Sequence, residues 1–255
     1  MGSGVNHAPG HPEILRIVAP NPGPMTLEGT NTYIYGADPC VVIDPGSDDA
    51  AHLDAIRAAV DQRGGIGLVL LTHSHADHTA GADQLGAEVV LPGDGEVHHG
   101  LRALATPGHA ADHVSFLSDG GAAEGPGQLS GGVCFSGDLV LGLGSTIVPP
   151  GGGSLAAYMD SLRLLQAETI ELIAPGHGPW ITDPAAKLAE YVEHREMREQ
   201  RLLTALDRGE RSRAALLAEA WSDIPIELLP MAAMAMEAHL EKLEGDGRLP
   251  GDLVA

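Results

Sequence analysis

The feature that most constrains this chain is the segment LTHSHADHTAG, which overlaps the end of the apolar run IGLVLL at residues 66–71. Four potential metal ligands, His73, His75, Asp77 and His78, lie within six positions. A short apolar run of this kind is typical of a buried strand, and residues two apart on a strand share a face. Imidazole and carboxylate groups suit zinc, iron or manganese. The segment therefore predicts a metal site where a strand leaves a sheet.

One such cluster cannot complete the coordination of two metal ions, so further ligands should follow along the chain. Three candidates follow, each after an apolar, strand-like run: His109 in ATPGHAAD, Asp138 in FSGDL and His177 in APGHGPW. If these were unrelated surface residues, there would be no reason for each of them to follow an apolar, strand-like run. The pattern favours a site for two metal ions.

Composition narrows the class of protein. With 255 residues, of which 44% are hydrophobic, the chain can bury the core of one large domain and a small appended one. The formal net charge of -21 opposes non-specific attraction to nucleic acid or anionic membrane. No leader-like or membrane-spanning apolar run is visible, so a cytoplasmic protein without membrane contact is expected. Cys40 and Cys134 lie in strand-like runs and are expected to be buried small hydrophobes.

Residues 1–186 have the pattern of an α/β domain. TYIYG and CVVIDPG predict a hairpin, and DDAAHLDAIRAAVDQRGG predicts a helix with Asp48 or Ser47 as its N-cap. A further helix is expected in SLAAYMDSLRLLQ and a short one in TAGADQL. Strands are expected in IGLVLL, AEVVLP, HVSFLS, GVCFSGD and TIELIAP, with a Gly-rich loop over residues 119–132.

Residues 187–255 form a separate C-terminal region, because helical patterns dominate from Pro184 onward. Three helices are expected, and the closing RLPGDLVA is read as a short strand or wing. The MAAMAM stretch is expected in the core of the last helix rather than on a binding surface.

The full ligand set resembles that of the metallo-β-lactamase-fold hydrolases. Within them, the stretches NPGPMTLEGTNTYIYG, SGDLVLGLGST, PGHGP and YVEHREMREQ are similar to the lactamase-beta-2-like group. The similarity extends from Asn21 to Leu249. It implies an αβ/βα sandwich with a dinuclear metal site along one edge, followed by a winged-helix-like C-terminal domain.

The resemblance also implies how the ligands are shared. Two divalent ions, expected to be Zn²⁺ given the His and Asp ligands, would share a hydroxide that serves as the nucleophile. Asp77 would both bind metal and orient this nucleophile. One ion would be held by His73, His75 and His109, the other by Asp77, His78 and His177, and Asp138 would bridge them.

Five further residues are candidates with alternative roles. Asp44, at a strand end, is either bonded to a ligand histidine or part of a turn. His113 is either a hydrogen-bonding histidine in the core or behind the ligands, which is the expected role, or a ligand itself. Asn31 either faces the substrate or serves turn chemistry. Arg195 and Arg198 either bind an anionic substrate at the metal edge or lie on a solvated face with neighbouring glutamates.

The substrate is less constrained than the site. The resemblance implies an endoribonuclease, so a phosphodiester such as single-stranded RNA is the expected substrate, although residues 1–186 contain only 5 Lys and Arg against 21 Asp and Glu. RNA-binding proteins usually present a basic surface. Alternatives are a glyoxalase II-like hydrolase of a thioester or other ester, a β-lactamase, and a non-catalytic metal-stabilised binding module. Seven ligands over two ions leave open coordination positions, which favours an enzyme acting on an anionic or ester substrate.

Overall fold

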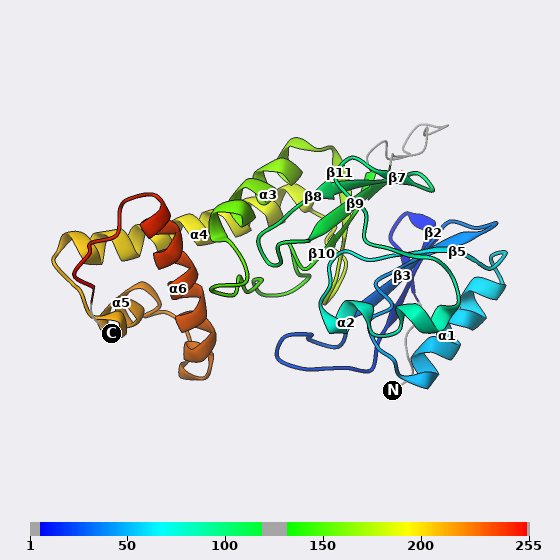
Figure 1. Cartoon of the computed structure of the whole chain (residues 1–255), viewed down its shortest axis with the longest axis horizontal. Helices are drawn as coiled ribbons and strands as arrows, with labels where there is room; N and C mark the ends of the chain where they lie inside the picture. Colours follow the sequence, from blue (N-terminus) through cyan, green and yellow to red (C-terminus); the bar gives the residue numbers. More distant parts are fainter. Residues whose placement is uncertain (1–5, 119–131, 254–255) are drawn as a thin grey trace.

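The computed structural model describes residues 6–118 and 132–253, and its first part is built on two β-sheets (Figure 1). The first sheet has six strands in sequential order. Its hairpin of β3 and β4 is antiparallel, as the sequence predicts, whereas β4, β5 and β6 are parallel to one another. The strands are β1 (Asn6–Ala8), β2 (His11–Val18), β3 (Asn31–Tyr35), β4 (Cys40–Ile43), β5 (Ile66–Leu70) and β6 (Val89–Val90).

The second sheet has five strands in the order β11-β10-β9-β8-β7. All neighbouring pairs are antiparallel except β10 and β11, which are parallel. The strands are β7 (Val97–His98), β8 (Leu101–Ala105), β9 (Val114–Ser118), β10 (Gly132–Gly137) and β11 (Ile170–Pro175).

Three apolar cores hold these layers together. The central core lies between the sheets and includes Tyr33, Phe116 and Phe135, with Tyr33 and Phe135 in edge-to-face contact. A second core lies between the first sheet and α1 (Ala50–Asp61). A third packs the second sheet against α3 (Leu155–Ala167) and the start of α4 (Pro184–Asp207). Figure 1 shows α1 and α3 on opposite outer sides, which is the αβ/βα sandwich that the resemblance implies.

The predicted helices and strands are present with small changes. The N-cap of α1 is Asp49, whose side chain accepts from the backbone N–H of His52, so Asp48 and Ser47 were the wrong candidates. The short helix expected after His78 is two elements, α2 (Ala76–Thr79) and the 3₁₀ helix η1 (Ala82–Leu85). The expected Gly-rich loop falls almost wholly outside the described residues. Both cysteines are buried free thiols, as expected.

The C-terminal region is helical and has an apolar core of its own. This core includes Leu202, Leu216, Trp221 and Met236, contributed by α4, the end of α5 (Arg213–Ala220) and α6 (Leu229–Gly245). The boundary between residues 186 and 187 lies in the first turn of α4, so this helix belongs to both parts. The closing segment contains no strand over its described residues, 248–253. Across the described ranges, no helix combines the length and apolarity needed to cross a lipid bilayer.

Candidate metal centre

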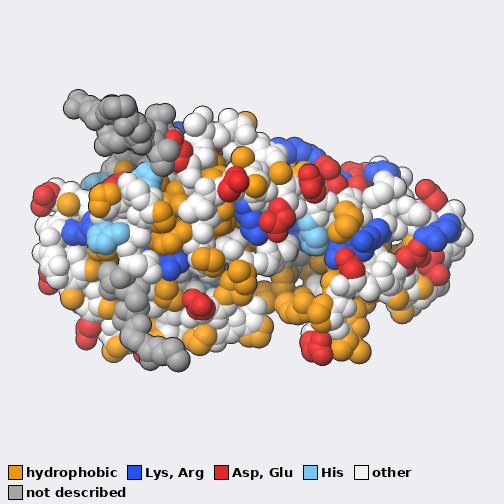
Figure 2. All heavy atoms as spheres, turned by 180° about the vertical axis from the view of Figure 1, so that it is seen from behind, with side chains coloured by type: hydrophobic (Ala, Val, Ile, Leu, Met, Phe, Trp, Pro, Cys, Tyr) orange, Lys and Arg blue, Asp and Glu red, His pale blue; other side chains and the backbone are white. Residues whose placement is uncertain are grey.

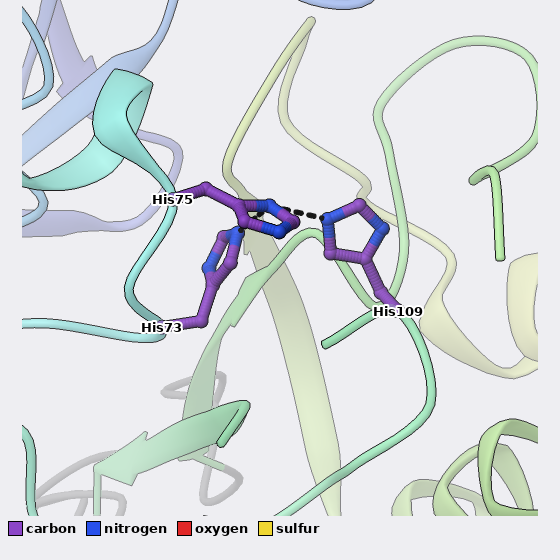
Figure 3. A group of neighbouring side chains, drawn as sticks. All are labelled: His73, His75 and His109. Atoms are coloured by element: carbon purple, nitrogen blue, oxygen red, sulfur yellow. Dashed lines mark hydrogen bonds between the residues drawn. The ribbon is translucent and has the colours of Figure 1, made fainter. Parts of the chain in front are cut away.

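Three histidines converge on one point where two sheets end. His73 follows β5, His75 is the N-cap residue of α2, and His109 follows β8. The Nδ1 atom of His75 lies 3.0 Å from His73 Nε2 and 3.0 Å from His109 Nε2 (Figure 3). These three ring nitrogens form a compact donor set, called here the three-histidine group. The resemblance to the metallo-β-lactamase-fold hydrolases implies this set, and the fold brings its members together.

A second donor set, the Asp77 group, consists of Asp77, His78 and His177. The first two lie on α2, and His177 lies just after β11. Asp77 Oδ2 is 3.3 Å from His177 Nε2 and 3.8 Å from His78 Nε2. His78 and His177 are fully buried, whereas the Asp77 side chain is 33% exposed. The only partly exposed member of the set can therefore contact both the other ligands and a substrate.

Asp138, directly after β10, lies between the two groups. Its Oδ1 atom is 3.4 Å from the Nε2 atoms of both His78 and His177, and its Oδ2 atom is 3.6 Å from His109 Nε2. One carboxylate oxygen thus faces each group, which is the geometry required of a bridging ligand. A Cβ atom at Gly176 would come within 2.5 Å of Asp138 Oδ1, so this position requires glycine.

The donor atoms themselves indicate that the residues fit metal ions. His78 Nε2, Asp138 Oδ1 and His177 Nε2 are buried and have no hydrogen-bond partner among the described residues. Buried polar atoms without partners are rare and costly, so such a cluster needs an explanation. Imidazole nitrogens and carboxylate oxygens within 4.8 Å of one another are a donor set for a divalent cation.

The second ring nitrogen of each buried ligand histidine contacts a protein oxygen. His109 Nδ1 donates to the carbonyl of Ile147 at 2.8 Å, and His177 Nδ1 lies 3.3 Å from the carbonyl of Gly29. His73 Nδ1 lies 3.0 Å from the hydroxyl of Thr72. Such contacts fix ring orientation and leave the opposite nitrogen free to bind a metal.

Asp44 supplies the corresponding contact for His78. Its Oδ2 atom is 2.9 Å from His78 Nδ1, and its carboxylate also accepts from the backbone N–H and hydroxyl of Thr72. Asp44 has a φ of 49°, in the left-handed region. The two roles considered for this residue, a turn position and a partner of a ligand histidine, are therefore both present.

We expect Asp44→Asn to weaken metal binding by about 10- to 100-fold, the usual cost of removing a partner of a ligand histidine. Asn tolerates left-handed backbone, so the turn should survive. Competition with a chromophoric chelator measures the affinity. Asp94→Asn is the control, because Asp94 accepts from the backbone N–H of Ala105 and lies outside both donor sets. If the two variants bind metal with equal affinity, Asp44 does not support His78 as a metal ligand.

His113 acts behind the ligands, as the sequence predicts. Its Nε2 atom accepts from the backbone N–H of Asp138 at 3.1 Å, and its Nδ1 atom lies 2.9 Å from the hydroxyl of Thr106. Burial lowers the pKa of His113 to about 3, so its ring is neutral at pH 7 and can accept this bond. His113 therefore fixes the backbone that carries Asp138.

The charges at the site suit a cation. Burial lowers the pKa of His73 and His109, which leaves both rings neutral as metal ligands must be. Burial alone would also lower the pKa of His177, but the Asp138 and Asp77 carboxylates outweigh it and raise that pKa to about 9. Burial would raise the pKa of Asp138, but His78 and His177 hold it well below its usual value. The carboxylates therefore attract positive charge to these donors.

The three predicted substrate-binding residues are buried side chains. Asn31 is buried, and its amide donates to the carbonyls of Pro175 and Gly178, so it holds the loop that carries His177. Arg195 and Arg198 are each 4% exposed, so the solvated-face interpretation is wrong for both. A substrate contact by Asn31 or either arginine stays a prediction.

The two arginines are partnered within the protein. Arg195 donates to the Ser145 hydroxyl and to the Thr146 carbonyl. Arg198 donates to the carbonyl of Ala220 at 2.6 Å and forms an ion pair with Asp223. Their charge is therefore used to hold the loop after β10 and the end of α5.

A pocket of about 340 Å³ opens beside the metal ligands. His109 and Asp138 border one side of it, and the helices of the C-terminal region border the other. Most of its remaining lining is apolar: Pro24, Met25, Leu27, Leu141, Leu143, Ile147, Trp221, Ile224, Leu228, Met231, Ala232 and Ala235. We call this cavity the apolar pocket. No pattern in the sequence predicts it, and MAAMAM was expected to lie in the core of the last helix.

Known proteins share both sequence and fold with this chain. The model of the metallo-beta-lactamase superfamily matches residues 25–90. The beta-lactamase-like protein 2 homolog of Drosophila melanogaster is 30% identical over 277 residues, covering 92% of this chain and 89% of that protein. The lactamase-like protein adaB of Aspergillus niger is 36% identical over 227 residues, covering 80% of this chain. The chain spans 66% of that protein's length.

Two further matches bear on activity and on fold. A protein of Aspergillus chevalieri named atrochrysone carboxyl ACP thioesterase is 35% identical over 219 residues, covering 76% of this chain and 66% of its own length. The metallo-beta-lactamase family protein TTHA1429 of Thermus thermophilus superimposes with a TM-score of 0.71 at 22% identity, covering 92% of this chain and 94% of that one. The expected fold is therefore confirmed. Because the Drosophila relative is 30% identical along nearly its whole length, the chain belongs to the metallo-beta-lactamase superfamily of hydrolases.

Proposed function

We propose that the chain is a metal-dependent hydrolase that cleaves a thioester, with the three-histidine group and the Asp77 group each holding one divalent ion, expected to be Zn²⁺. The reaction adds water to the carbonyl carbon and releases a carboxylic acid and a thiol. The observation that carries the choice of substrate is the apolar pocket, which has His109 and Asp138 on its border.

The lining of the pocket favours an acyl group over a phosphodiester. Among the described residues, Arg195 and Arg198 are its only Lys or Arg side chains, and both already have protein acceptors. A nuclease needs cationic groups along a backbone of phosphates, and the net charge of -21 opposes such a ligand. Single-stranded RNA, implied by the lactamase-beta-2 resemblance, is therefore the less supported substrate. The name of the A. chevalieri relative adds support for a thioester.

The steps of the hydrolysis can be assigned to residues of this chain. Divalent ions at the two groups would supply an acidified water molecule and polarise the substrate carbonyl. The Asp77 carboxylate orients the attacking water and accepts its proton, because it is the partly exposed acid of the site. Burial would raise the pKa of Asp77, but His177 and His78 lower it below its usual value, so the group is ionised and able to accept at neutral pH.

A panel of substrates tests this proposal. Zinc-loaded protein should hydrolyse S-lactoylglutathione and the octanoyl thioester of N-acetylcysteamine much faster than it cleaves single-stranded RNA, bis-p-nitrophenyl phosphate or nitrocefin. Asp77→Asn protein provides the blank for contaminating activities. Turnover of RNA or of the phosphodiester above that of both thioesters would overturn the proposal in favour of a nuclease.

A further inference from the structure

We propose that the face of α6 bordering the apolar pocket selects the length of the substrate's acyl group. The C-terminal helical region would then be the acyl-binding part of the enzyme, rather than only an appended domain. This inference rests on the proposed thioester hydrolysis and assigns its specificity to particular residues. It begins with the spacing of the pocket residues along α6.

Three pocket residues lie on one face of this helix, and a fourth lies at its N-cap position. Leu228, the N-cap residue of α6, is followed by Met231, Ala232 and Ala235 at spacings of three, four and seven. Residues at these spacings share one helical face. The MAAMAM segment therefore contributes to both the core and the pocket, because Met236 lies in the core of the C-terminal region and Met231 lines the apolar pocket.

The mouth of the pocket is apolar and open to solvent. Met25 is 50% exposed, Leu143 is 61% exposed and Leu228 is 41% exposed, and these come from three separate segments. Figure 2 shows hydrophobic side chains on both sides of the hollow between the main body and the C-terminal helices. Large apolar side chains gathered around one opening mark a binding site, because an apolar ligand removes them from water.

The pocket runs from the metal ligands to the helices, which sets the direction of the ligand. A carbonyl placed beside His109 and Asp138 would leave the acyl chain to lie along the apolar lining, which includes Trp221 and residues of α6. Trp221 is 4% exposed and lies against the Arg198 guanidinium, 5.4 Å from its ring centroid. Because Arg198 is also paired with Asp223, this end of the pocket offers apolar contact rather than a free cation.

Small side chains on α6 leave space in the pocket for an acyl chain. Ala232 and Ala235 both face the pocket, and a larger residue at either position would occupy space that a long acyl chain needs. Binding energy from the distal part of the chain contributes to kcat/KM. We expect kcat/KM of the unsubstituted protein to rise about fourfold per added methylene until the pocket is full.

The test compares acetyl, butyryl, hexanoyl and octanoyl thioesters of N-acetylcysteamine. Ala235→Leu should lower kcat/KM for the octanoyl thioester by roughly tenfold or more and leave the acetyl thioester within about twofold. Ala235→Val, a smaller change, should give an intermediate loss. The matched control is Ala233→Leu, on the same helix but outside the pocket lining. Thermal unfolding of each variant checks that the fold is kept.

Binding of octanoate, measured by calorimetry, separates the two proposals. Loss of octanoate binding in Ala235→Leu but not in Ala233→Leu supports the pocket even if no thioester is hydrolysed, and in that case only the proposed function falls. Thioester hydrolysis with no dependence on acyl length, or an equal loss on all four substrates in Ala235→Leu, overturns the assignment of α6 and leaves the proposed function standing.

Discussion

Asp77→Asn is expected to lower kcat by about 10²- to 10⁴-fold, the usual contribution of a positioned general base. The amide keeps the shape of the side chain but cannot accept the proton of the attacking water. The side chain is 33% exposed and lies in a four-residue helix, so the substitution should leave the fold intact. Steady-state kinetics at saturating zinc measure the effect without confusing it with loss of metal.

A control variant and a measurement of metal content are needed to interpret the kinetics of Asp77→Asn. Asp83→Asn is the control, because Asp83 is an exposed acid a few residues further along and lies outside both donor sets. Metal content is determined for both variants by elemental analysis. Retained turnover in Asp77→Asn with altered metal content would make Asp77 a ligand only, and the proton would then have to be accepted elsewhere.

The positions of the metal-site residues could be predicted from the sequence because of a simple rule of sheets. Side chains that directly follow buried strands collect where those strands end, so His73, His109, Asp138 and His177 meet although they are far apart in the sequence. The apolar runs before His73, Asp138 and His177 are short and clear, whereas β8, the strand before His109, was not among the predicted strands. Strand pairing then supplies the distances, which no sequence pattern contains.

The strands β1, β2, β7 and β8 were not predicted, because their patterns are weak. β2 carries a proline at its second position, and only its later residues, Leu15–Val18, alternate between buried and half-buried. β1 and β7 are three and two residues long, too short for any periodicity to be visible. These strands are defined by their hydrogen-bonded neighbours rather than by their own residues.

The environment of Arg195 and Arg198 also could not be predicted from the sequence. Three-residue spacing with nearby glutamates is typical of a solvated helix face. Both side chains are buried instead, because their acceptors, the Thr146 and Ala220 carbonyls, come from segments distant in the sequence. The apolar pocket has the same origin, since its walls join loops of the sandwich to α6. Tertiary contacts of this kind leave no local pattern.

Asp138→Ala is expected to empty both donor sets together and to abolish measurable turnover. Its two carboxylate oxygens face opposite groups, at 3.4 Å from His177 Nε2 and 3.6 Å from His109 Nε2. Without them, each set keeps only three donors and the bridging charge is lost. Elemental analysis of purified protein should show a fall from about two ions per chain, as expected of a two-metal site, to well below one.

Stability gives an independent check, because metal bound only to the folded state raises the free energy of unfolding by about 2.7 kcal/mol at 100 times Kd. A chelator should therefore lower the Tm of the unsubstituted protein but leave that of Asp138→Ala unchanged. Asp138→Asn keeps the volume of the side chain and separates loss of charge from a packing defect. Asp160→Ala, at an exposed position on α3, serves as the control. One tightly held ion, equal in amount in Asp138→Ala and in the unsubstituted protein, would contradict a shared two-metal centre bridged by this residue.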